Sequence, residues 1–421
     1  MIGAMLELDE GRRESFVPLV TAWLARRGAD VGVGTIEVVE VEVLLAGRPG
    51  LLDVVARVDG RIAHLVLGLH AHGTEIKMLR GADDGVLGEF EDERGIALAV
   101  DALRDAELAP LVMIAIVGEE PGVVSIMRDD DSAVVLDVEG RCSFSVFPWL
   151  TDGPHPGVDM LVTLDEVGFN HLAAPIALWR RQGRDLGVVQ ELLMGSAGGW
   201  ALALTSLRDL YGSGVRPEQA GGDFAVEARS LGTMAARMHL ASDKAFGRGS
   251  GAVADWAAEV ESVAHRLAPE LLARSGASDT LAALGSSTDR YPTVRTHGDL
   301  HLGRTARTDQ GWVVADWLPG GVDAAGAPLL RCPLADVAAM LWSFHYVATA
   351  ALDERDPALR PGLEPSAEAW EARNRRAFLA GYLDTPGIEE LVPADRDLVA
   401  QLTAAFELEQ SALRPDRRPA A

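Results

Sequence analysis

The chain has few cysteines, fewer basic than acidic residues, and no long uninterrupted apolar run. Its 421 residues include only two cysteines, Cys142 and Cys332, which offer neither a disulfide framework nor a metal-binding spacing. The longest apolar run, 108–117, contains Pro110 and is shorter than the ~20 residues needed to cross a bilayer. The N-terminus has no basic segment followed by an apolar one, so we expect no secretory signal. These absences predict a cytoplasmic protein without disulfides.

Acidic residues outnumber basic ones, 63 against 38, and the formal net charge is -25. Such a charge repels a phosphate backbone, so nucleic acid is not an expected partner. It favours a cationic small molecule, whereas a nucleotide would need Mg²⁺ and local basic residues to bind. A chain of this length exceeds one ordinary core, so we expect two or three lobes.

Residues 1–95 combine one helix with strands of partly alternating polarity, separated by glycine and proline turns. The predicted elements are a helix over 11–27 and strands over 36–44, 51–58 and 64–69. This pattern predicts an α+β cap subdomain.

Residues 96–194 favour a second, β-rich subdomain, and residues 195–421 favour helices almost throughout. For the second subdomain we predict helices over 95–106 and 157–166, with strands over 123–127, 133–138, 142–147, 176–180 and 186–193. For the last region we predict helices over 200–211, 224–241, 253–273, 333–352, 367–383 and 394–413. We expect residues 414–421 to be frayed. The predicted fold is α+β and bilobal, with a five-stranded antiparallel sheet in one lobe and a helical second lobe.

The segment from His297 to Arg304 carries the most informative residues of the chain. Asp299 lies on a glycine-bracketed loop, and Asp316 ends a short apolar strand after a predicted hairpin. Phosphoryl transfer uses one carboxylate to accept the proton of an attacking hydroxyl and another to hold Mg²⁺. We therefore predict that Asp299 is catalytic and that Asp316 binds the metal. An isolated aspartate of either kind could instead be a turn residue.

Two further segments are expected to support such a site. Asp336 lies early in the predicted helix over 333–352, where a carboxylate can receive backbone N–H groups; we expect Asp336 and His297 to support the loop. The apolar strand over 186–193 runs toward Gly195 as a hinge between lobes would. We predict that Gln190, Glu191 and Leu193 in this segment contact the nucleotide. The same sequence is equally typical of a core strand without a binding role.

Several of these segments together resemble the actinobacterial maltokinases of the aminoglycoside-phosphotransferase-like, protein-kinase-like superfamily. The matching pieces are 101–108, 189–191 with 199–200, 231–232 with 238–241, 297–303, 333–344 and 406–409. The resemblance implies an N-terminal cap, a kinase-like intermediate subdomain and a helical C-lobe. It also implies ATP and Mg²⁺ as cofactors, with Asp299 as the catalytic and Asp316 as the metal-binding aspartate.

The chain departs from the maltokinase pattern at three places. Arg304 replaces an amide, and a guanidinium cannot bind Mg²⁺ but could contact phosphate. The sequence after Asp316, over 317–321, lacks two carboxylates of the family, and Ser145 stands where a lysine is expected. Asp159 falls roughly where the glutamate partner of that lysine would lie.

The departures make the chain more similar to the maltokinase-related enzymes that phosphorylate glucosamine. The resemblance implies transfer of the γ-phosphoryl group of ATP to an amino sugar, by a monomer or homodimer. Candidate sugar-binding residues are His301, His345, Tyr346 and Glu409. The alternatives are a maltokinase, an aminoglycoside phosphotransferase, or a pseudokinase that binds nucleotide without turnover.

Overall fold

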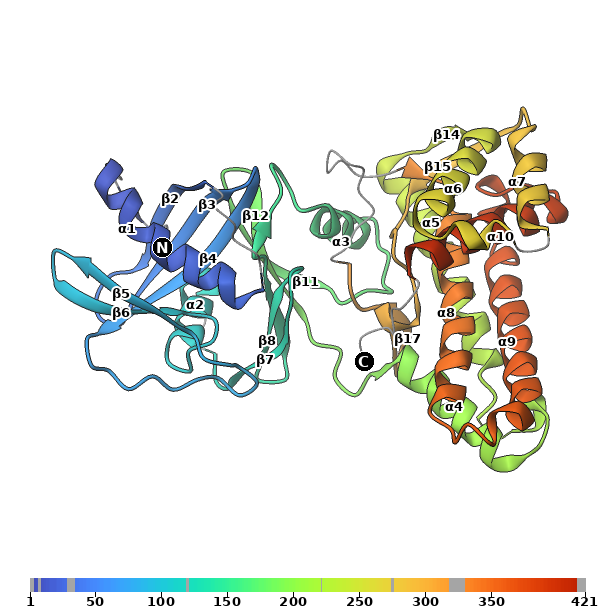
Figure 1. Cartoon of the computed structure of the whole chain (residues 1–421), viewed down its shortest axis with the longest axis horizontal. Helices are drawn as coiled ribbons and strands as arrows, with labels where there is room; N and C mark the ends of the chain where they lie inside the picture. Colours follow the sequence, from blue (N-terminus) through green and yellow to red (C-terminus); the bar gives the residue numbers. More distant parts are fainter. Residues whose placement is uncertain are drawn as a thin grey trace. The chain divides into compact units, whose positions relative to one another are not determined.

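The computed structural model describes residues 4–6, 9–28, 35–118, 121–220, 222–273, 276–317 and 330–414. The chain divides into two compact units, shown in Figure 1. One unit comprises residues 1–158 and 174–194, and the other comprises residues 159–173 and 195–421. The predicted division into three subdomains, with boundaries at 95 and 194, stays a prediction.

An antiparallel sheet and one helix form the first part of the N-terminal unit. In the described residues the strand order is β1-β2-β3-β4-β6-β5, and β10 also pairs with β4. The elements are β1 (Ala4–Met5), α1 (Glu10–Arg26), β2 (Ile36–Leu45), β3 (Gly50–Val58), β4 (Arg61–Ala71), β5 (Val86–Asp92), β6 (Gly95–Asp101) and β10 (Trp149–Leu150). Asp9 caps α1, and Phe16 and Leu24 on α1 enter the same core as strand residues such as Val54 and Leu67. The predicted helix and the first three predicted strands are confirmed.

The predicted helix over 95–106 is wrong. Residues Gly95–Asp101 form β6, which pairs with both β4 and β5. The helix comes later, as α2 (Leu108–Val117), in the longest apolar run of the sequence. Pro110 is tolerated there because it lies in the first turn, where a backbone N–H has no helical partner.

A second antiparallel sheet completes the N-terminal unit. Its order in the described residues is β11-β12-β9-β8-β7. The strands are β7 (Val124–Asp129), β8 (Val134–Val138), β9 (Cys142–Val146), β11 (Pro175–Arg181) and β12 (Arg184–Glu191). Helix α3 (Pro156–Glu166) follows β10 in the chain, and most of it belongs to the C-terminal unit. The predicted five-stranded sheet is therefore confirmed.

Helices dominate the C-terminal unit, as predicted. They are α4 (Gly199–Ser213), α5 (Ala225–Phe246), α6 (Val253–Leu267), α7 (Ala277–Gly285), α8 (Leu334–Asp353), α9 (Arg360–Leu383) and α10 (Arg396–Leu413), with 3-10 turns η1 (Pro217–Gln219), η2 (Pro269–Leu271), η3 (Leu302–Arg304) and η4 (Ile388–Glu390). The predicted helix over 253–273 is too long, because α6 ends two residues before Pro269. Helix α7 was not predicted.

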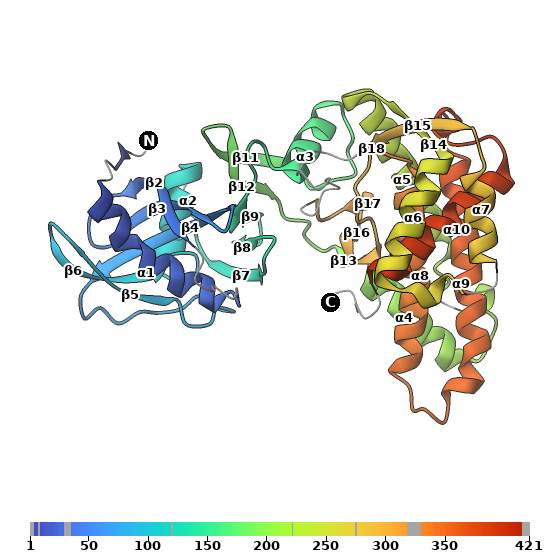
Figure 2. The same cartoon turned by 45° about the horizontal axis from the view of Figure 1, so that its top comes forward.

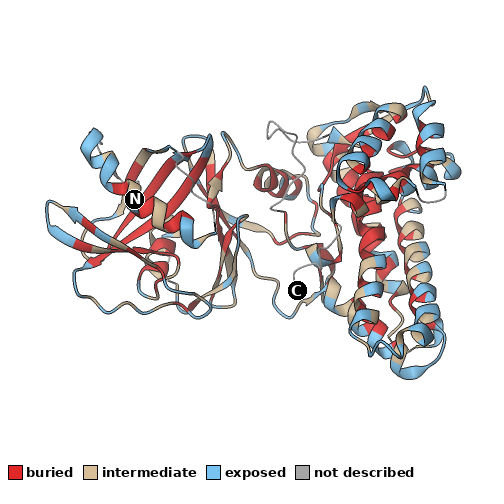
Figure 3. Cartoon of the chain, in the orientation of Figure 1, coloured by how far each residue is buried: buried red, intermediate tan, exposed pale blue. Residues whose placement is uncertain are grey.

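Helix α8 is the centre of the C-terminal unit. Fourteen of its residues are buried, and Figure 3 shows buried residues along nearly its whole length. An all-round apolar helix is typical of the interior of a bundle. Because α8 is held on all sides, its first turn is a rigid support for neighbouring loops.

Two small sheets border the helices of the C-terminal unit (Figure 2). One has the order β13-β16-β17 and the other β14-β15-β18. Their strands are β13 (Ala197–Gly198), β14 (Gly249–Ala252), β15 (Arg290–Arg295), β16 (Thr305–Thr308), β17 (Gly311–Val314) and β18 (Leu330–Arg331). The loop from His297 to Arg304 connects β15 with the β16–β17 hairpin. None of the described helices combines the length and the apolar character that a membrane span requires.

Candidate active site

The β16–β17 hairpin brings Asp299, the predicted catalytic residue, and Asp316, the predicted metal ligand, to the same end of one short structure. Thr305, just after the loop, pairs with Val314, just before Asp316. Gly298 has a φ of 82°, a backbone conformation that favours glycine over residues with a side chain. This turn directs the chain so that Asp299 and Asp316 approach the same side chain, Arg304.

Arg304 bridges the two carboxylates. Its Nε and Nη2 atoms donate to Asp299 Oδ2 at 3.1 and 3.0 Å, and its Nη1 forms an ion pair with Asp316 Oδ2. Arg414, at the end of α10, forms an ion pair with the other oxygen of Asp299, Oδ1. Each aspartate is therefore neutralised by a guanidinium from the chain itself. Arg414 belongs to the segment expected to be frayed; residues 415–421 lie outside the described residues.

Asp336 anchors the catalytic loop to the first turn of α8. Its Oδ2 accepts from His297 N at 2.8 Å and lies 3.1 Å from His239 Nε2, while Oδ1 accepts from Gly298 N at 2.9 Å. Burial opposes ionisation of Asp336, but the hydrogen bond and charge of His239, together with His297 and the Gly298 N–H, outweigh it and lower the pKa of Asp336. Asp336 is thus an ionised, buried acceptor of two backbone N–H groups of the loop, and its supporting role in catalysis stays a prediction.

His297 connects the loop to the segment that follows β17, at Asp316. Its Nε2 lies 2.8 Å from the Asp316 carbonyl oxygen, and its Nδ1 accepts from Asp299 N at 3.2 Å. These roles require a neutral ring with the proton on Nε2. Burial lowers the pKa of His297, which favours that neutral form.

His301 lies beside Asp299, the predicted catalytic residue. Its Nε2 is 3.7 Å from Asp299 Oδ2, and its Nδ1 accepts from Gly303 N at 3.1 Å. Burial, with the nearby charge of Arg304, lowers the pKa of His301 to about 4. At neutral pH His301 can therefore donate a hydrogen bond near Asp299 but adds no positive charge.

The strand before the loop makes a contact that the sequence did not indicate. Arg295 Nη1 on β15 donates to Asp159 Oδ2 on α3 at 2.5 Å. Asp159, expected to lie near the partner position of the missing lysine, is thus paired with Arg295. Trp317 follows Asp316 and packs against His297, with ring centroids 5.3 Å apart; residues 318–321 of the divergent segment lie outside the described residues.

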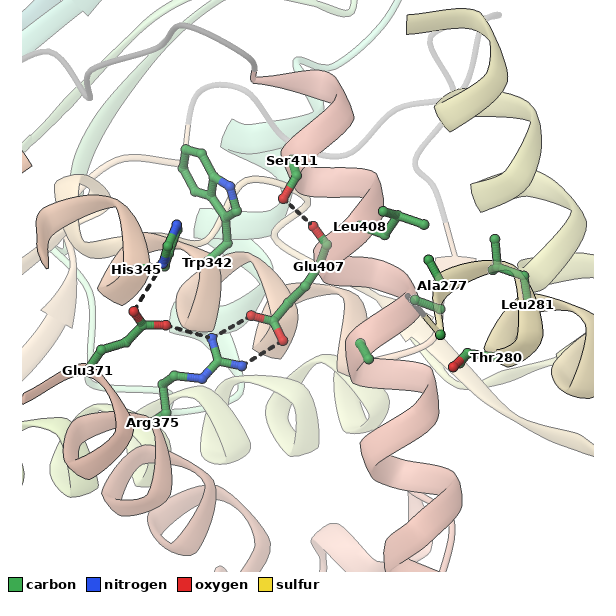
Figure 4. A pocket seen from close by; sticks show the side chains of 13 residues that line it. Ala277, Thr280, Leu281, Trp342, His345, Glu371, Arg375, Glu407, Leu408 and Ser411 are labelled. Carbon is green, nitrogen blue, oxygen red and sulfur yellow. Dashed lines mark hydrogen bonds and ion pairs between the residues drawn. The ribbon is translucent and has the colours of Figure 1, made fainter. Parts of the chain in front are cut away.

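A cavity of about 630 Å³ lies between helices α7, α8, α9 and α10 (Figure 4). Arg375 on α9 pairs with Glu407 on α10 at 2.5 and 2.7 Å and with Glu371 at 3.7 Å. His345 Nδ1 lies 3.0 Å from Glu371, and this hydrogen bond raises the pKa of His345. Trp342 supplies an aromatic wall to the same cavity (Figure 4).

Trp342 links the cavity to the catalytic loop. The Arg414 guanidinium lies over the Trp342 ring, 5.1 Å from its centroid, while it also pairs with Asp299. Arg414 therefore connects a residue that lines the cavity to Asp299, and the cavity is large enough for a monosaccharide.

Of the predicted sugar-binding residues, His345 lines this cavity and His301 adjoins Asp299. Tyr346 stacks on Trp342, with centroids 5.1 Å apart. Both oxygens of Glu409 accept from Arg331 Nη2, at 2.9 and 3.0 Å, and the side chain is buried. Roles of Tyr346 and Glu409 in binding sugar stay predictions.

Several residues of this region were not expected from sequence. Glu371, Arg375 and Arg414 belong to none of the segments that match the maltokinases, and Trp342 and Glu407 lie in matching segments but were assigned no role. Only their positions in the packed bundle bring them together.

The predicted nucleotide-binding residues belong to the N-terminal unit. Gln190 and Glu191 end β12, where the Glu191 N–H donates to the Ala174 carbonyl at 2.9 Å. Leu193 lies just beyond this strand. Contacts of Gln190, Glu191 and Leu193 with a nucleotide stay predictions.

The residues present suit one Mg²⁺ ion rather than two. Mg²⁺ is commonly held by one or two carboxylates together with phosphate oxygens and water, and Asp316 can provide such a carboxylate. Within the described ranges, no group of three or more His, Cys, Asp or Glu side chains converges on a common point. Arg304 occupies the position where an amide would serve a second ion and cannot act as a ligand.

The fold is that of a kinase-like class of protein, with a β-rich unit, a helical unit and a loop in which Arg304 joins Asp299 to Asp316. The chain is similar to a glucosamine kinase of Mycolicibacterium smegmatis, with 28% identity over 287 residues, covering 63% of this chain and 67% of that protein. No known protein-family model matches the chain.

Solved structures confirm the predicted fold. A glucosamine kinase in complex with glucosamine, ADP and inorganic phosphate matches with a TM-score of 0.62, 21% identity and 90% coverage of both chains. A second crystal form of glucosamine kinase matches with a TM-score of 0.63, the same identity and the same coverage. The resemblance to this group of kinases, expected from sequence, is therefore confirmed.

Proposed function

We propose that the protein is an ATP-dependent kinase that phosphorylates glucosamine to glucosamine 6-phosphate. The observation that carries the proposal is the convergence of Asp299 and Asp316 on Arg304, in a loop anchored by Asp336. The similarity to a glucosamine kinase supports the choice of acceptor. Action in the cytoplasm as a monomer or homodimer stays a prediction.

In the proposed reaction, Asp299 accepts a hydrogen bond from the acceptor hydroxyl and takes its proton as the hydroxyl oxygen attacks the γ-phosphorus. The new O–P bond forms while the bond to the bridging oxygen breaks, and ADP leaves with that electron pair. Asp316 would hold Mg²⁺, which supplies positive charge to the phosphate oxygens when bound. Arg414 pairs with Asp299 Oδ1, so an acceptor hydroxyl that approaches this oxygen would compete with Arg414 for it.

We assign the acceptor to the cavity beside Trp342. Its two carboxylates, Glu371 and Glu407, suit the ammonium group of an amino sugar, and the Trp342 ring suits the apolar face of a sugar. The neutral His301 beside Asp299 would donate to the acceptor or to phosphate without adding charge.

The test is an assay of ADP release by the purified full-length chain, with ATP, Mg²⁺ and glucosamine, maltose, glucose or kanamycin in turn. Glucosamine should be the best acceptor, and mass spectrometry should find its monophosphate. The Asp299→Asn variant should lose about 100-fold or more in kcat. The Asp309→Asn variant, at the exposed tip of the hairpin, is the matched control and should be unaffected. Equal turnover of Asp299→Asn and wild type, or no transfer to glucosamine, would refute the proposal.

A second experiment tests the acceptor cavity. Glu407→Gln and Glu371→Gln should each raise the KM for glucosamine about tenfold, the usual size of a lost charged hydrogen bond, while the KM for ATP stays unchanged. Glu364→Gln, on the exposed side of α9, serves as the control. If the KM for glucosamine is unchanged in both cavity variants, the acceptor lies elsewhere.

A further inference from the structure

Arg304 is fixed in place by its backbone as well as by its side chain. Its N–H donates to the His301 carbonyl at 2.9 Å, and its carbonyl accepts from Ala315 N at 2.8 Å. One backbone bond thus joins it to the catalytic loop and the other to the strand that leads to Asp316. The side chains of Arg304, Asp299 and Asp316 are only 21%, 19% and 15% exposed.

The position of Arg304 matters because of the charges that phosphoryl transfer has to balance. Kinases commonly use two Mg²⁺ ions, one on the strand-end aspartate and one that also needs an amide of the catalytic loop. Arginine offers no lone pair and cannot replace that amide as a ligand. Its guanidinium does, however, bring positive charge to the space between the two carboxylates.

We infer that the Arg304 guanidinium takes the place of the second metal ion. The site then works with a single Mg²⁺ per nucleotide, held by Asp316 and the phosphates, while Arg304 supplies the remaining positive charge. Arg304 also holds Oδ2 of Asp299, so that Oδ1 is the oxygen presented to the acceptor. This inference rests on the proposed kinase function.

Arg304 could have one of two roles in these ion pairs, and the roles predict different numbers of bound metal ions. If Arg304 only positions Asp299, its removal impairs turnover but leaves the number of bound metal ions unchanged. If it replaces a metal ion, an amide at position 304 restores a ligand and admits a second ion. The number of ions bound without turnover therefore separates the two readings.

The experiment counts Mn²⁺, as a paramagnetic probe for Mg²⁺, on the full-length protein saturated with a non-hydrolysable ATP analogue. Free Mn²⁺ is followed by electron paramagnetic resonance during titration. We expect one Mn²⁺ per nucleotide in wild type, one in Arg304→Lys, which keeps the charge, and two in Arg304→Gln. Arg307→Gln, which removes a neighbouring arginine that pairs with Glu227 outside the site, should also bind one.

Turnover provides the second readout. With Mg²⁺ equal to ATP, Arg304→Gln should be at least about tenfold slower than wild type, as expected for a lost charged contact, and should recover as free Mg²⁺ is raised. Wild type should show no such requirement. Two ions in wild type, or one ion in Arg304→Gln, would overturn the inference while leaving the kinase assignment intact. Failure of wild type to bind Mn²⁺ with the nucleotide, together with no phosphorylation of glucosamine, would overturn both.

Discussion

Replacement of Asp336 tests whether the catalytic loop depends on one buried carboxylate. In Asp336→Asn the side chain keeps its shape, but one of its two oxygens becomes an NH₂ group that faces a donor, either Gly298 N or the His297 and His239 pair. An unsatisfied buried donor costs about 1–3 kcal/mol. In Asp336→Ala all these donors lose their acceptor, so we expect a loss of about 3–5 kcal/mol in the free energy of unfolding, as for a broken buried ion pair.

The same substitution should slow the reaction. His297 and Gly298 directly precede Asp299, so a loop released from Asp336 no longer holds the base in place. A displacement of about 1 Å can cost about 100-fold in rate, and we expect a fall in kcat of this size for Asp336→Asn, with little change in the KM for ATP. Urea titrations followed by the fluorescence of the nine tryptophans measure stability, and ADP release measures turnover.

The contribution of Asp336 to the free energy of unfolding should decrease at acidic pH. Because the pKa of Asp336 is lowered in the folded chain, its stabilisation is complete above the unfolded value of about 3.9 and is lost as the pH falls through the folded value. The difference in unfolding free energy between wild type and Asp336→Asn should therefore be constant above about pH 5 and shrink below about pH 4. Asp353→Asn, at the exposed end of the same helix, is the control. Equal stability and kcat in Asp336→Asn and this control would contradict the anchoring role.

Three further substitutions test neighbouring parts of the C-terminal unit. Gly381→Ala should lower stability by about 1–3 kcal/mol in thermal unfolding, because its Cβ would lie 1.9 Å from the Arg229 carbonyl oxygen; Gly362→Ala, in open space on the same helix, should not. Glu409→Gln should cost about 3 kcal/mol by leaving Arg331 without its buried partner, whereas a rise in the KM for glucosamine at unchanged melting temperature would favour the sugar-binding role predicted from sequence. Arg414→Ala should lower the KM for glucosamine by roughly two- to fivefold, since the ion pair it loses is worth up to ~1 kcal/mol; an unchanged or higher KM would show that Arg414 does not compete with the acceptor.

Much of the fold followed from local pattern, and the errors occurred where long-range pairing decided the structure. Alternating polarity located β2, β3 and β4, and the apolar periodicity around Asp336 located α8. The run 95–106 has no strict alternation, yet its first part becomes β6 because β4 and β5 lie on either side of it. Such pairing cannot be seen in an eleven-residue window.

The residues of the candidate site also differ in how far they could be predicted from local sequence. Asp299, Arg304 and Asp316 flank one short hairpin, so their spacing indicates that they lie close together. Arg414 is 115 residues from Asp299 along the chain, and the cavity carboxylates lie on two other helices. Their contribution depends on how α8, α9 and α10 pack, which no short motif records.

The two arginines that pair with Asp299, Arg304 and Arg414, are held to different extents by the rest of the chain. This difference determines which of them we expect an acceptor to displace. Arg304 is held by backbone bonds on both sides and reaches a second carboxylate, Asp316. Arg414 follows the last residue of α10 and reaches Asp299 from over the Trp342 ring, which also lines the acceptor cavity. The hydroxyl of a sugar in that cavity would compete with Arg414 for Asp299 Oδ1. In a chain with a net charge of -25, the retained Arg304 would then be the cation that limits repulsion between Asp299, Asp316 and the incoming triphosphate. We therefore expect acceptor binding to exchange Arg414 for a hydroxyl while Arg304 stays between the carboxylates.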